Sequence, residues 1–190
     1  MKAQLQQQHR QLTRIMPLYS FKGINPQLGK GVFIAPSADV IGKVIFAENV
    51  NIWYQCVARG DVNTITVGKN TNIQDLTMLH VTKDFALTIG ENVSIGHSVT
   101  LHGCTIEDSC LIGMGAVIMD GAHIGANSVV AGGSVVPPGK KYPPKSMIMG
   151  SPAKAVRELT QEEIVQYGNH YKAYVLYKDE YLDPSQVKLL

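Results

Sequence analysis

The sequence has few cysteines, little net charge and no long apolar segment, and each of these shortages excludes something. Its three cysteines, Cys56, Cys104 and Cys110, are odd in number and show no C-x-x-C spacing. This favours a reduced compartment in which the thiols act as small hydrophobic side chains. No segment resembles a membrane span. We therefore expect a cytoplasmic protein with no membrane contact.

Basic residues are neither numerous nor clustered. The formal net charge is +2, and the chain has no run of Lys and Arg. Binding to the phosphates of nucleic acid requires clustered cations. Nucleic acid is therefore not an expected partner.

The N-terminal region has no acidic residues. Residues 1–38 lack Asp and Glu but carry Lys2, Arg10, Arg14, Lys22 and Lys30, a bias that is similar to that of a transit peptide. The Gln-rich start of the chain fits better with an arm that is disordered or contacts another subunit. We therefore assign residues 1–20 to an N-terminal arm.

Aliphatic residues recur at six-residue intervals over much of the chain. This period is neither that of a helix nor the alternation of a strand. It predicts an all-β architecture, a triangular parallel β-helix in which each hexapeptide buries one aliphatic side chain and then turns. The recurring positions are Ile41, Val67, Ile73, Leu79, Ile89, Ile95, Leu101, Ile106, Ile112, Ile118, Ile124, Val130 and Val136, and glycine directly follows several of them.

Three hexapeptides make one coil of about 18 residues, so the repeat over residues 40–141 predicts about five to six coils stacked at about 4.8 Å. We assign residues 21–156 to the β-helix and residues 157–183 to a C-terminal α-helix. Thr160 and Glu163 form a capping-box pattern, and Pro184 is expected to end the helix. The helical stripe, which is expected to pack on the prism or on a neighbour, contains Ile164, Tyr167, Tyr171, Tyr174 and Lys178.

The repeat assigns the buried residues to three faces, which we name A (Ile73 and Ile95), B (Leu79 and Leu101) and C (Ile89). The step from Leu79 to Ile89 is ten residues long instead of six. We expect the four extra residues to form a loop around residues 82–86.

Two histidines occupy equivalent positions in successive coils. His80 and His102 each follow the buried leucine of a face-B strand, so they point outward about 4.8 Å apart. Imidazoles at that spacing can share one ion at about 2.0 to 2.1 Å per bond. The spacing therefore predicts a metal site on face B.

A third histidine lies across an edge of the prism from this pair. His97 follows Ile95 of face A by two residues, so a threefold assembly that packs face A of one subunit beside face B of the next would bring it to the pair. This geometry predicts a homotrimer with three interface sites. Gln74 lies on face A one coil before His97, and the same packing would carry it toward an oxygen bound to the metal.

Charged residues also fall on these lateral faces. Asp75, Arg59 and Asp61 are expected to pair across the subunit interface, because a packed lateral face is otherwise apolar. The remaining histidines, His9, His123 and His170, lack the register of the other three, and we interpret them as ordinary surface residues.

Four segments together carry a family resemblance. They are Arg59-Gly60-Asp61, Asn72-Ile73-Gln74-Asp75, Met78-Leu79-His80 and Gly96-His97-Ser98-Val99-Thr100-Leu101-His102-Gly103. The chain resembles the gamma-class carbonic anhydrase family over nearly its whole length after the arm. The resemblance implies a left-handed β-helix and a homotrimer. It also implies zinc, or ferrous iron or cobalt, bound by His80 and His102 of one subunit and His97 of its neighbour.

The resemblance also implies an activity, the reversible hydration of CO2 to bicarbonate by a metal-bound hydroxide. Gln74 and Tyr174 would then approach the metal-bound water, and Arg59 and Asp61 would act in the subunit contact. The chain departs from the family archetype after Asp61, where Val62 replaces an acid, and in the short loop after His80, where Asp84 is the only acid. Both departures weaken the expectation of fast proton export.

Two other functions fit the same repeat. A hexapeptide-repeat acyltransferase uses the same prism and a trimer, with one histidine as general base and no metal. A non-catalytic metal-binding or assembly protein is the other alternative, because the missing acids affect catalysis and not metal binding. The paired histidines favour the carbonic anhydrase over the acyltransferase.

Overall fold

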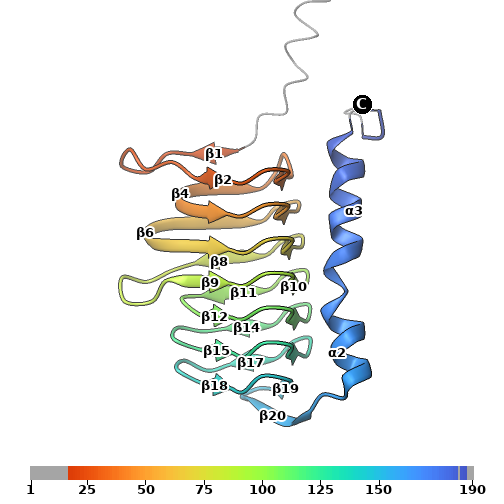
Figure 1. Ribbon diagram of the computed structural model, residues 1–190. Helices are drawn as coiled ribbons and strands as arrows, with labels where there is room; N and C mark the ends of the chain where they lie inside the picture. Colours follow the sequence, from red (N-terminus) through yellow and green to blue (C-terminus); the bar gives the residue numbers. More distant parts are fainter. Residues whose placement is uncertain (1–16, 184, 188–190) are drawn as a thin grey trace, which may run out of the picture.

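The computed structural model describes residues 17–183 and 185–187, and its short strands stack into a parallel β-helix with three faces (Figure 1). The predicted β-helical fold class is confirmed. Residues 1–16, which make up most of the predicted arm, and Pro184 lie outside the described residues. The helical part of the chain runs along the whole length of the prism (Figure 1).

Face A is a sheet of parallel strands closed by an antiparallel hairpin. Ile73 pairs with Ile95, as predicted from the repeat. The strands are β3 (Phe33–Ile34), β5 (Asn51–Ile52), β7 (Asn72–Ile73), β10 (Ser94–Ile95), β13 (Leu111–Ile112), β16 (Val129–Val130) and β19 (Ser146–Gly150), followed by β20 (Ala153–Glu158).

Faces B and C are joined near the N-terminal end by two long strands that run around the corner between them. These are β4 (Asp39–Phe46) and β6 (Val57–Val67), and β6 pairs with β8 on face B and with β9 on face C. Face B contains β1 (Leu18–Tyr19), β8 (Met78–His80), β11 (Thr100–His102), β14 (Val117–Ile118) and β17 (Val135–Val136). Face C contains β2 (Gln27–Leu28), β9 (Leu87–Ile89), β12 (Thr105–Ile106), β15 (His123–Ile124) and β18 (Lys141–Tyr142).

The predicted loop between Leu79 and Ile89 is confirmed. Strand β8 ends at His80 and β9 begins at Leu87. Ile89 nevertheless stays in line with Val67 of the preceding coil and Ile106 of the following coil. The extra residues are therefore extruded without disturbing the stack.

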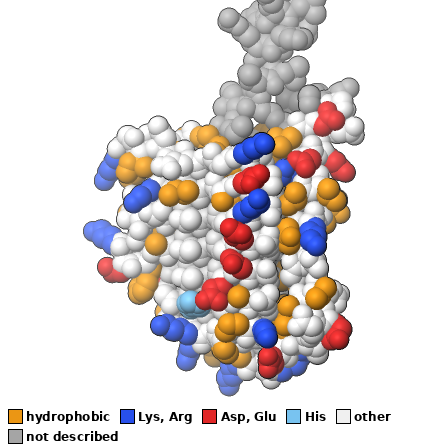
Figure 2. All heavy atoms as spheres, viewed as in Figure 1, with side chains coloured by type: hydrophobic (Ala, Val, Ile, Leu, Met, Phe, Trp, Pro, Cys, Tyr) orange, Lys and Arg blue, Asp and Glu red, His pale blue; other side chains and the backbone are white. Residues whose placement is uncertain are grey.

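The corner between faces C and A carries a polar ladder. Asn49 Nδ2 donates to Asn70 Oδ1 at 3.1 Å, and Asn70 Nδ2 donates to Asn92 Oδ1 at 2.9 Å. Glu48 and Lys69 form an ion pair of 2.9 Å beside it. Figure 2 shows acidic and basic side chains following one another in a column down the molecule. This corner is therefore a solvated edge held by contacts between successive coils.

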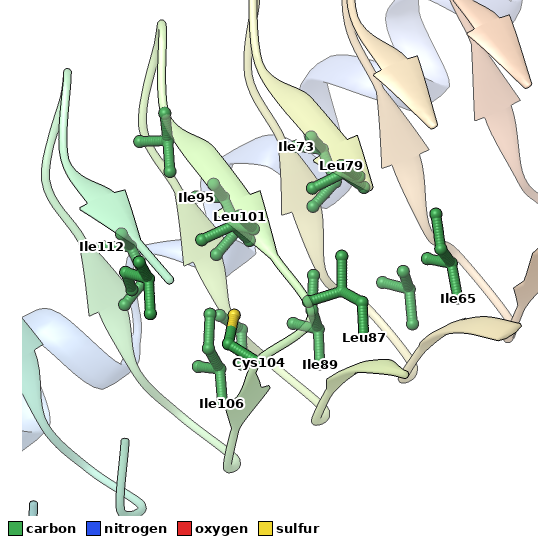
Figure 3. Packing of buried hydrophobic residues seen from close by; sticks show 14 of the residues in the cluster. Ile65, Ile73, Leu79, Leu87, Ile89, Ile95, Leu101, Cys104, Ile106 and Ile112 are labelled. Atoms are coloured by element: carbon green, nitrogen blue, oxygen red, sulfur yellow. The ribbon is translucent and has the colours of Figure 1, made fainter. Parts of the chain in front are cut away.

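The core is a column of aliphatic side chains stacked coil upon coil (Figure 3). Cys56, Cys104 and Cys110 lie in it as free thiols. Burial raises the pKa of each thiol to about 12, so they behave as the small hydrophobic side chains that the sequence predicted.

One position of the predicted repeat is wrong. Val40 is fully buried and belongs to the core, whereas Ile41 is only partly buried and faces outward. Gly42, which suggested the repeat at Ile41, serves another purpose: a Cβ there would lie 2.6 Å from the carbonyl oxygen of Gly60. The glycine permits a close approach of β4 and β6, and the repeat itself starts earlier, at Ile34.

The segment 157–183, predicted as one α-helix, contains the end of β20 and then two helices, α2 (Gln161–Gly168) and α3 (Tyr171–Leu182). The predicted capping box is confirmed, because Thr160 Oγ1 accepts from Glu163 N and Glu163 Oε2 accepts from Thr160 N. Both helices pack on face A. Ile164 and Tyr167 of α2 pack against a cluster of Val129, Met147 and Leu159, and α3 lies across β3, β5 and β7. No helix within the described residues is long and apolar enough to cross a bilayer.

We expect Ile95→Ala to destabilise the chain by about 2–5 kcal/mol, because truncating a fully buried side chain leaves a cavity in a close-packed column. Thr88→Ala, on the exposed side of face C, should change the stability by less than about 0.5 kcal/mol. Guanidinium unfolding followed by circular dichroism measures both. Equal stability of the two variants would contradict a core that depends on this column.

Candidate metal centre

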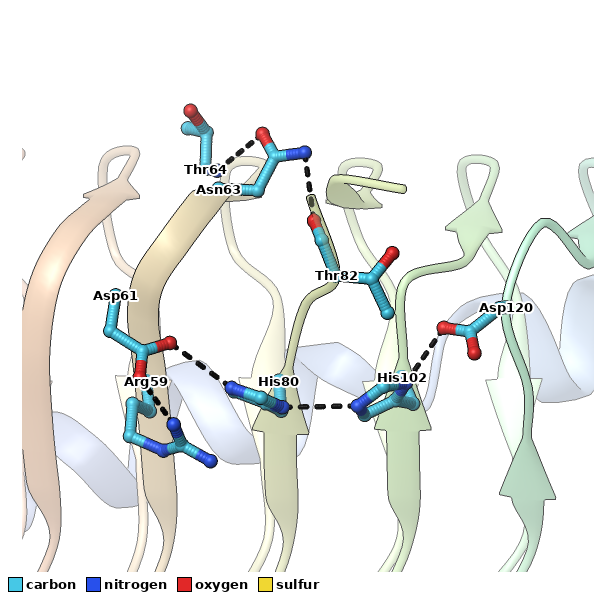
Figure 4. A network of polar contacts seen from close by, with 8 residues as sticks. All are labelled: Arg59, Asp61, Asn63, Thr64, His80, Thr82, His102 and Asp120. Carbon is cyan, nitrogen blue, oxygen red and sulfur yellow. Dashed lines mark hydrogen bonds and ion pairs between the residues drawn. The ribbon is translucent and has the colours of Figure 1, made fainter. Parts of the chain in front are cut away.

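His80 and His102 lie directly one above the other on face B. The two residues are paired in the ladder between β8 and β11. His80 Nδ1 and His102 Nε2 are 3.0 Å apart, and the ring centroids are 5.0 Å apart (Figure 4). The predicted stacking of these two imidazoles is therefore present in the structure.

A carboxylate contacts the far side of each ring. Asp61 Oδ1 lies 3.1 Å from His80 Nε2, and Asp120 Oδ1 lies 2.6 Å from His102 Nδ1. Asp61 also pairs with Arg59 within the same chain. Burial alone would raise the pKa of Asp61, but hydrogen bonds from Arg59 and His80 outweigh it and leave the pKa lowered. Asp61 is therefore an anion that accepts from His80.

When both rings are neutral, the two carboxylates favour one placement of the ring protons. A neutral imidazole carries one N–H, and each carboxylate accepts that proton from the far nitrogen of its ring. The two nitrogens that face each other at 3.0 Å then both present lone pairs. Two lone pairs at that distance repel, so the arrangement suits a cation or a shared proton between the rings.

Asp120 is a site residue that was not predicted from the sequence. It lies 18 residues after His102, which is close to one coil, but the count gives only the position in line with His102. Ile118 pairs with Leu101, so Met119 follows in line with His102. Asp120 reaches the ring from the turn beyond β14, a direction that the repeat does not predict.

The other predicted site residues lie together beside face A. His97 Nδ1 is 2.9 Å from Asp75 Oδ2, and the other oxygen of Asp75 accepts from Tyr54 N at 3.0 Å. Gln74 is buried, and its Nε2 donates to Asn72 Oδ1 at 3.1 Å. Each of these groups is therefore fixed by a contact within the chain.

Tyr174 of α3 lies near this group. Its ring packs edge-on against Trp53 at 5.6 Å. Burial, followed by the charge of Asp75, raises the pKa of its hydroxyl. The hydroxyl therefore stays protonated well above neutral pH and can donate a hydrogen bond.

One copy of the chain brings two of the three predicted ligands together. Within residues 17–183 and 185–187, no three His, Cys, Asp or Glu side chains form a cluster that could hold a metal ion. His97 is paired with Asp75 and not with the His80–His102 pair. The roles of Arg59, Asp61 and Asp75 between subunits stay predictions.

The remaining histidines lie elsewhere. His123 pairs with Glu107 at 2.8 Å on face C, and His170 is exposed at the start of α3. His9 lies outside the described residues. His123 lies apart from both groups, whereas the ring of His170 lies 5.7 Å from the ring of Tyr174.

Comparisons with known proteins agree with the repeat. The sequence models of the bacterial transferase hexapeptide family (six repeats) and of the hexapeptide repeat of succinyl-transferase match residues 103–138 and 86–118. A solved structure described as a putative acetyltransferase from Bacillus cereus is 38% identical. Its TM-score is 0.84 over 86% of this chain and 95% of that one.

Three curated relatives are named carbonic anhydrases. Gamma carbonic anhydrase 2, mitochondrial, from Arabidopsis thaliana is 44% identical over 90% of this chain, which spans 65% of that relative. The probable carbonic anhydrase of Methanocaldococcus jannaschii is 48% identical over 78% of this chain and 93% of its own length. Because Gamma carbonic anhydrase 3, mitochondrial, from Arabidopsis thaliana is 47% identical over 95% of this chain and 75% of its own length, the chain belongs to the gamma-class carbonic anhydrase family of hexapeptide-repeat proteins.

Proposed function

We propose that this protein is a metal-dependent carbonic anhydrase that hydrates CO2 reversibly to bicarbonate. In this proposal, His80 and His102 of one subunit and His97 of a neighbour hold zinc or another divalent cation in a homotrimer. One observation carries the proposal: two imidazoles from successive coils face each other at 3.0 Å, each with a carboxylate on its far nitrogen. The names of the relatives give the reaction.

The donor set fits a divalent cation. Two nitrogens bound to a tetrahedral ion at about 2.0 to 2.1 Å lie about 3.3 Å apart, which is close to the 3.0 Å between His80 Nδ1 and His102 Nε2. Asp61 and Asp120 supply the outer contacts that orient metal-binding histidines and make them stronger ligands. A shared cation also removes the repulsion between the two facing lone pairs.

The surface of face B suits contact with a second copy. The column beside the histidines is largely apolar, and Met78 in it is 38% exposed. Leu76 and Met114, in turns at its edge, are also exposed. Exposed apolar side chains grouped on one face are typical of an interface. The remaining members of the column are Asp39, which is its one charged residue, Val57, Thr100, Val117 and Val135.

His97 is placed to complete the site of a neighbour. It projects beside face A, and a threefold axis that sets face A of one subunit against face B of the next would deliver it to the pair. Gln74 and Tyr174 lie on the same side as His97 and would travel with it. In this arrangement each subunit contributes His80 and His102 to one metal centre and His97 to another.

When bound, the ion activates water for attack on CO2, because coordination lowers the pKa of water to about 7, the value established for carbonic anhydrase itself. Side chains of the protein orient the metal ligands and the reactants. Asp61 and Asp120 orient the two rings. The Gln74 amide, held by Asn72, and the protonated Tyr174 hydroxyl are polar groups able to position the reactants. A cytoplasmic location remains part of the proposal.

Acyl transfer is the second candidate, because the Bacillus cereus structure is described as a putative acetyltransferase. Such an enzyme needs one histidine as a general base. It has no use for a second imidazole stacked against the first, nor for a carboxylate on the outer side of both. A metal-binding protein without catalysis is compatible with the same geometry and is separated from the enzyme only by measured activity.

We expect His102→Ala to lose its bound metal while the β-helix stays folded, since the side chain projects outward from the core column. His123→Ala is a matched control, because His123 also pairs with a carboxylate, Glu107, but on face C. Elemental analysis after loading with zinc gives the metal content, and circular dichroism reports the fold. Full metal content in His102→Ala, or its loss in His123→Ala, would refute the assigned ligands.

Mixed trimers test whether the site is shared. Unfolding and refolding His80→Ala together with His97→Ala should restore metal at about a quarter of the sites, since random mixing of a threefold assembly places an intact pair beside an intact His97 at that frequency. Mixing His80→Ala with His102→Ala is the control. Every subunit in that mixture lacks one histidine of the pair, so no site can regain all three ligands. Equal metal content in the two mixtures would show that ligands do not cross the interface.

Stopped-flow measurement tests the reaction. Zinc- or iron-loaded protein, prepared under reducing conditions, should accelerate CO2 hydration, and His97→Ala should reduce the rate to background because a ligand is lost. A thermal shift by acetyl-CoA without one by metal would support acyl transfer instead. Stoichiometric metal without activity in any metal form would support the non-catalytic protein.

A further inference from the structure

Asp120 belongs to a unit that includes the loop of residues 81–86. Gly103 has a left-handed φ of +51°, and a Cβ there would lie 2.6 Å from Asp120 Oδ1 and 2.8 Å from Phe85 Cβ. The absence of a side chain at this position is what lets the carboxylate and Phe85 both approach Gly103, next to His102. The glycine, the phenylalanine and the carboxylate therefore occupy one tightly filled space.

The ring of Phe85 extends over a second glycine. A Cβ at Gly121 would lie 2.9 Å from Phe85 Cε1, and Gly121 directly follows Asp120. Gly121 N donates to Gly103 O at 2.7 Å, so the two glycines belong to neighbouring coils. Phe85 remains 44% exposed, so it does not fill the core, and its contacts are with the backbone on both sides of the carboxylate.

The loop that carries Phe85 is itself fixed. Asn63 Nδ2 donates to the carbonyl oxygen of Thr82 at 3.0 Å (Figure 4). It also donates to the carbonyl oxygen of Lys83 at 3.0 Å. Thr82 Oγ1 accepts from Phe85 N at 3.0 Å, and Thr82 N donates to Phe85 O at 3.1 Å. The position of Phe85 is therefore determined by β6 and by a closed turn within the loop.

We propose that Asp120 is a positioning residue for the metal centre and that Phe85 holds it in place. Asp120 accepts the Nδ1 proton of His102, which leaves Nε2 as the lone pair aimed at His80 and at the ion. Phe85 packs over the two glycines that flank this contact and keeps the carboxylate against the ring. The inference rests on the proposed function, because it assigns a role toward the bound ion.

The physical basis is the cost of freeing the ring. Without an acceptor for its Nδ1 proton, His102 can rotate or take the other tautomer, and either change removes Nε2 from the site. A charged acceptor also makes the imidazole a stronger ligand, and losing such a partner weakens metal binding by about 10- to 100-fold. His80 keeps Asp61, so the site is weakened and not abolished.

Zinc affinity, measured in the full-length protein by competition with a chromophoric chelator, tests the proposal. We expect Asp120→Ala to bind zinc about 10- to 100-fold more weakly than the wild type. Asp120→Asn should fall between them, because an amide oxygen still accepts the proton. Asp108→Asn is the control, since Asp108 accepts from a backbone N–H of Glu91 and does not contact a histidine. The visible spectrum of the cobalt-loaded protein should change in Asp120→Ala only.

A double-mutant cycle tests the part assigned to Phe85. Phe85→Ala should weaken zinc binding, and Phe85→Ala with Asp120→Ala should bind no more weakly than Asp120→Ala alone, because both act through one contact. Additive effects would refute the role of Phe85. Wild-type affinity in Asp120→Ala would refute the role of Asp120 while leaving the metal site intact. A wild-type protein that binds no metal would overturn the proposed function and this inference together.

Discussion

The structure depends on one constraint, the in-register stacking of parallel coils. Hydrogen bonds between successive strands place equivalent residues about 4.8 Å apart, so a sequence interval becomes a column in space. The aliphatic core, the asparagine ladder at one corner and the His80–His102 pair are three results of the same rule. A metal site on such a ladder has rigid supports, because His80 and His102 each belong to a strand that is paired on both sides.

This rule explains how much could be predicted. Counting six-residue intervals assigned the faces, the extruded loop and the histidine pair correctly, since each depends on regular stacking. It failed at Ile41, where a long strand turns a corner and Gly42 is required by the close approach of Gly60. It also missed Asp120, whose carboxylate reaches His102 from a turn, and turn geometry is not specified by the repeat.

The predicted metal ligands are divided between two faces of the prism. Face B presents the paired rings, and the edge of face A presents His97 on Asp75. Neither group has three ligands, so in the proposed trimer metal binding and subunit association would stabilise each other. The sequence can predict such a division, because outward positions on each face follow from the count. The distance between His97 of one subunit and the His80–His102 pair of the next depends on how the copies pack. Counting residue intervals does not give that packing.

The loop after His80 is held by contacts at both of its sides. It is short, and Asp84 is its one acid, so it offers little for carrying protons away from the centre. Its other residues are held firmly, by Asn63 on one side and by the contact of Phe85 with two glycines on the other. A loop fixed in this way is suited to hold a neighbouring group still and poorly suited to swing between the site and solvent. In the proposed enzyme the loop therefore contributes through the position of Asp120, and export of the proton has to use the solvent-facing side of the centre.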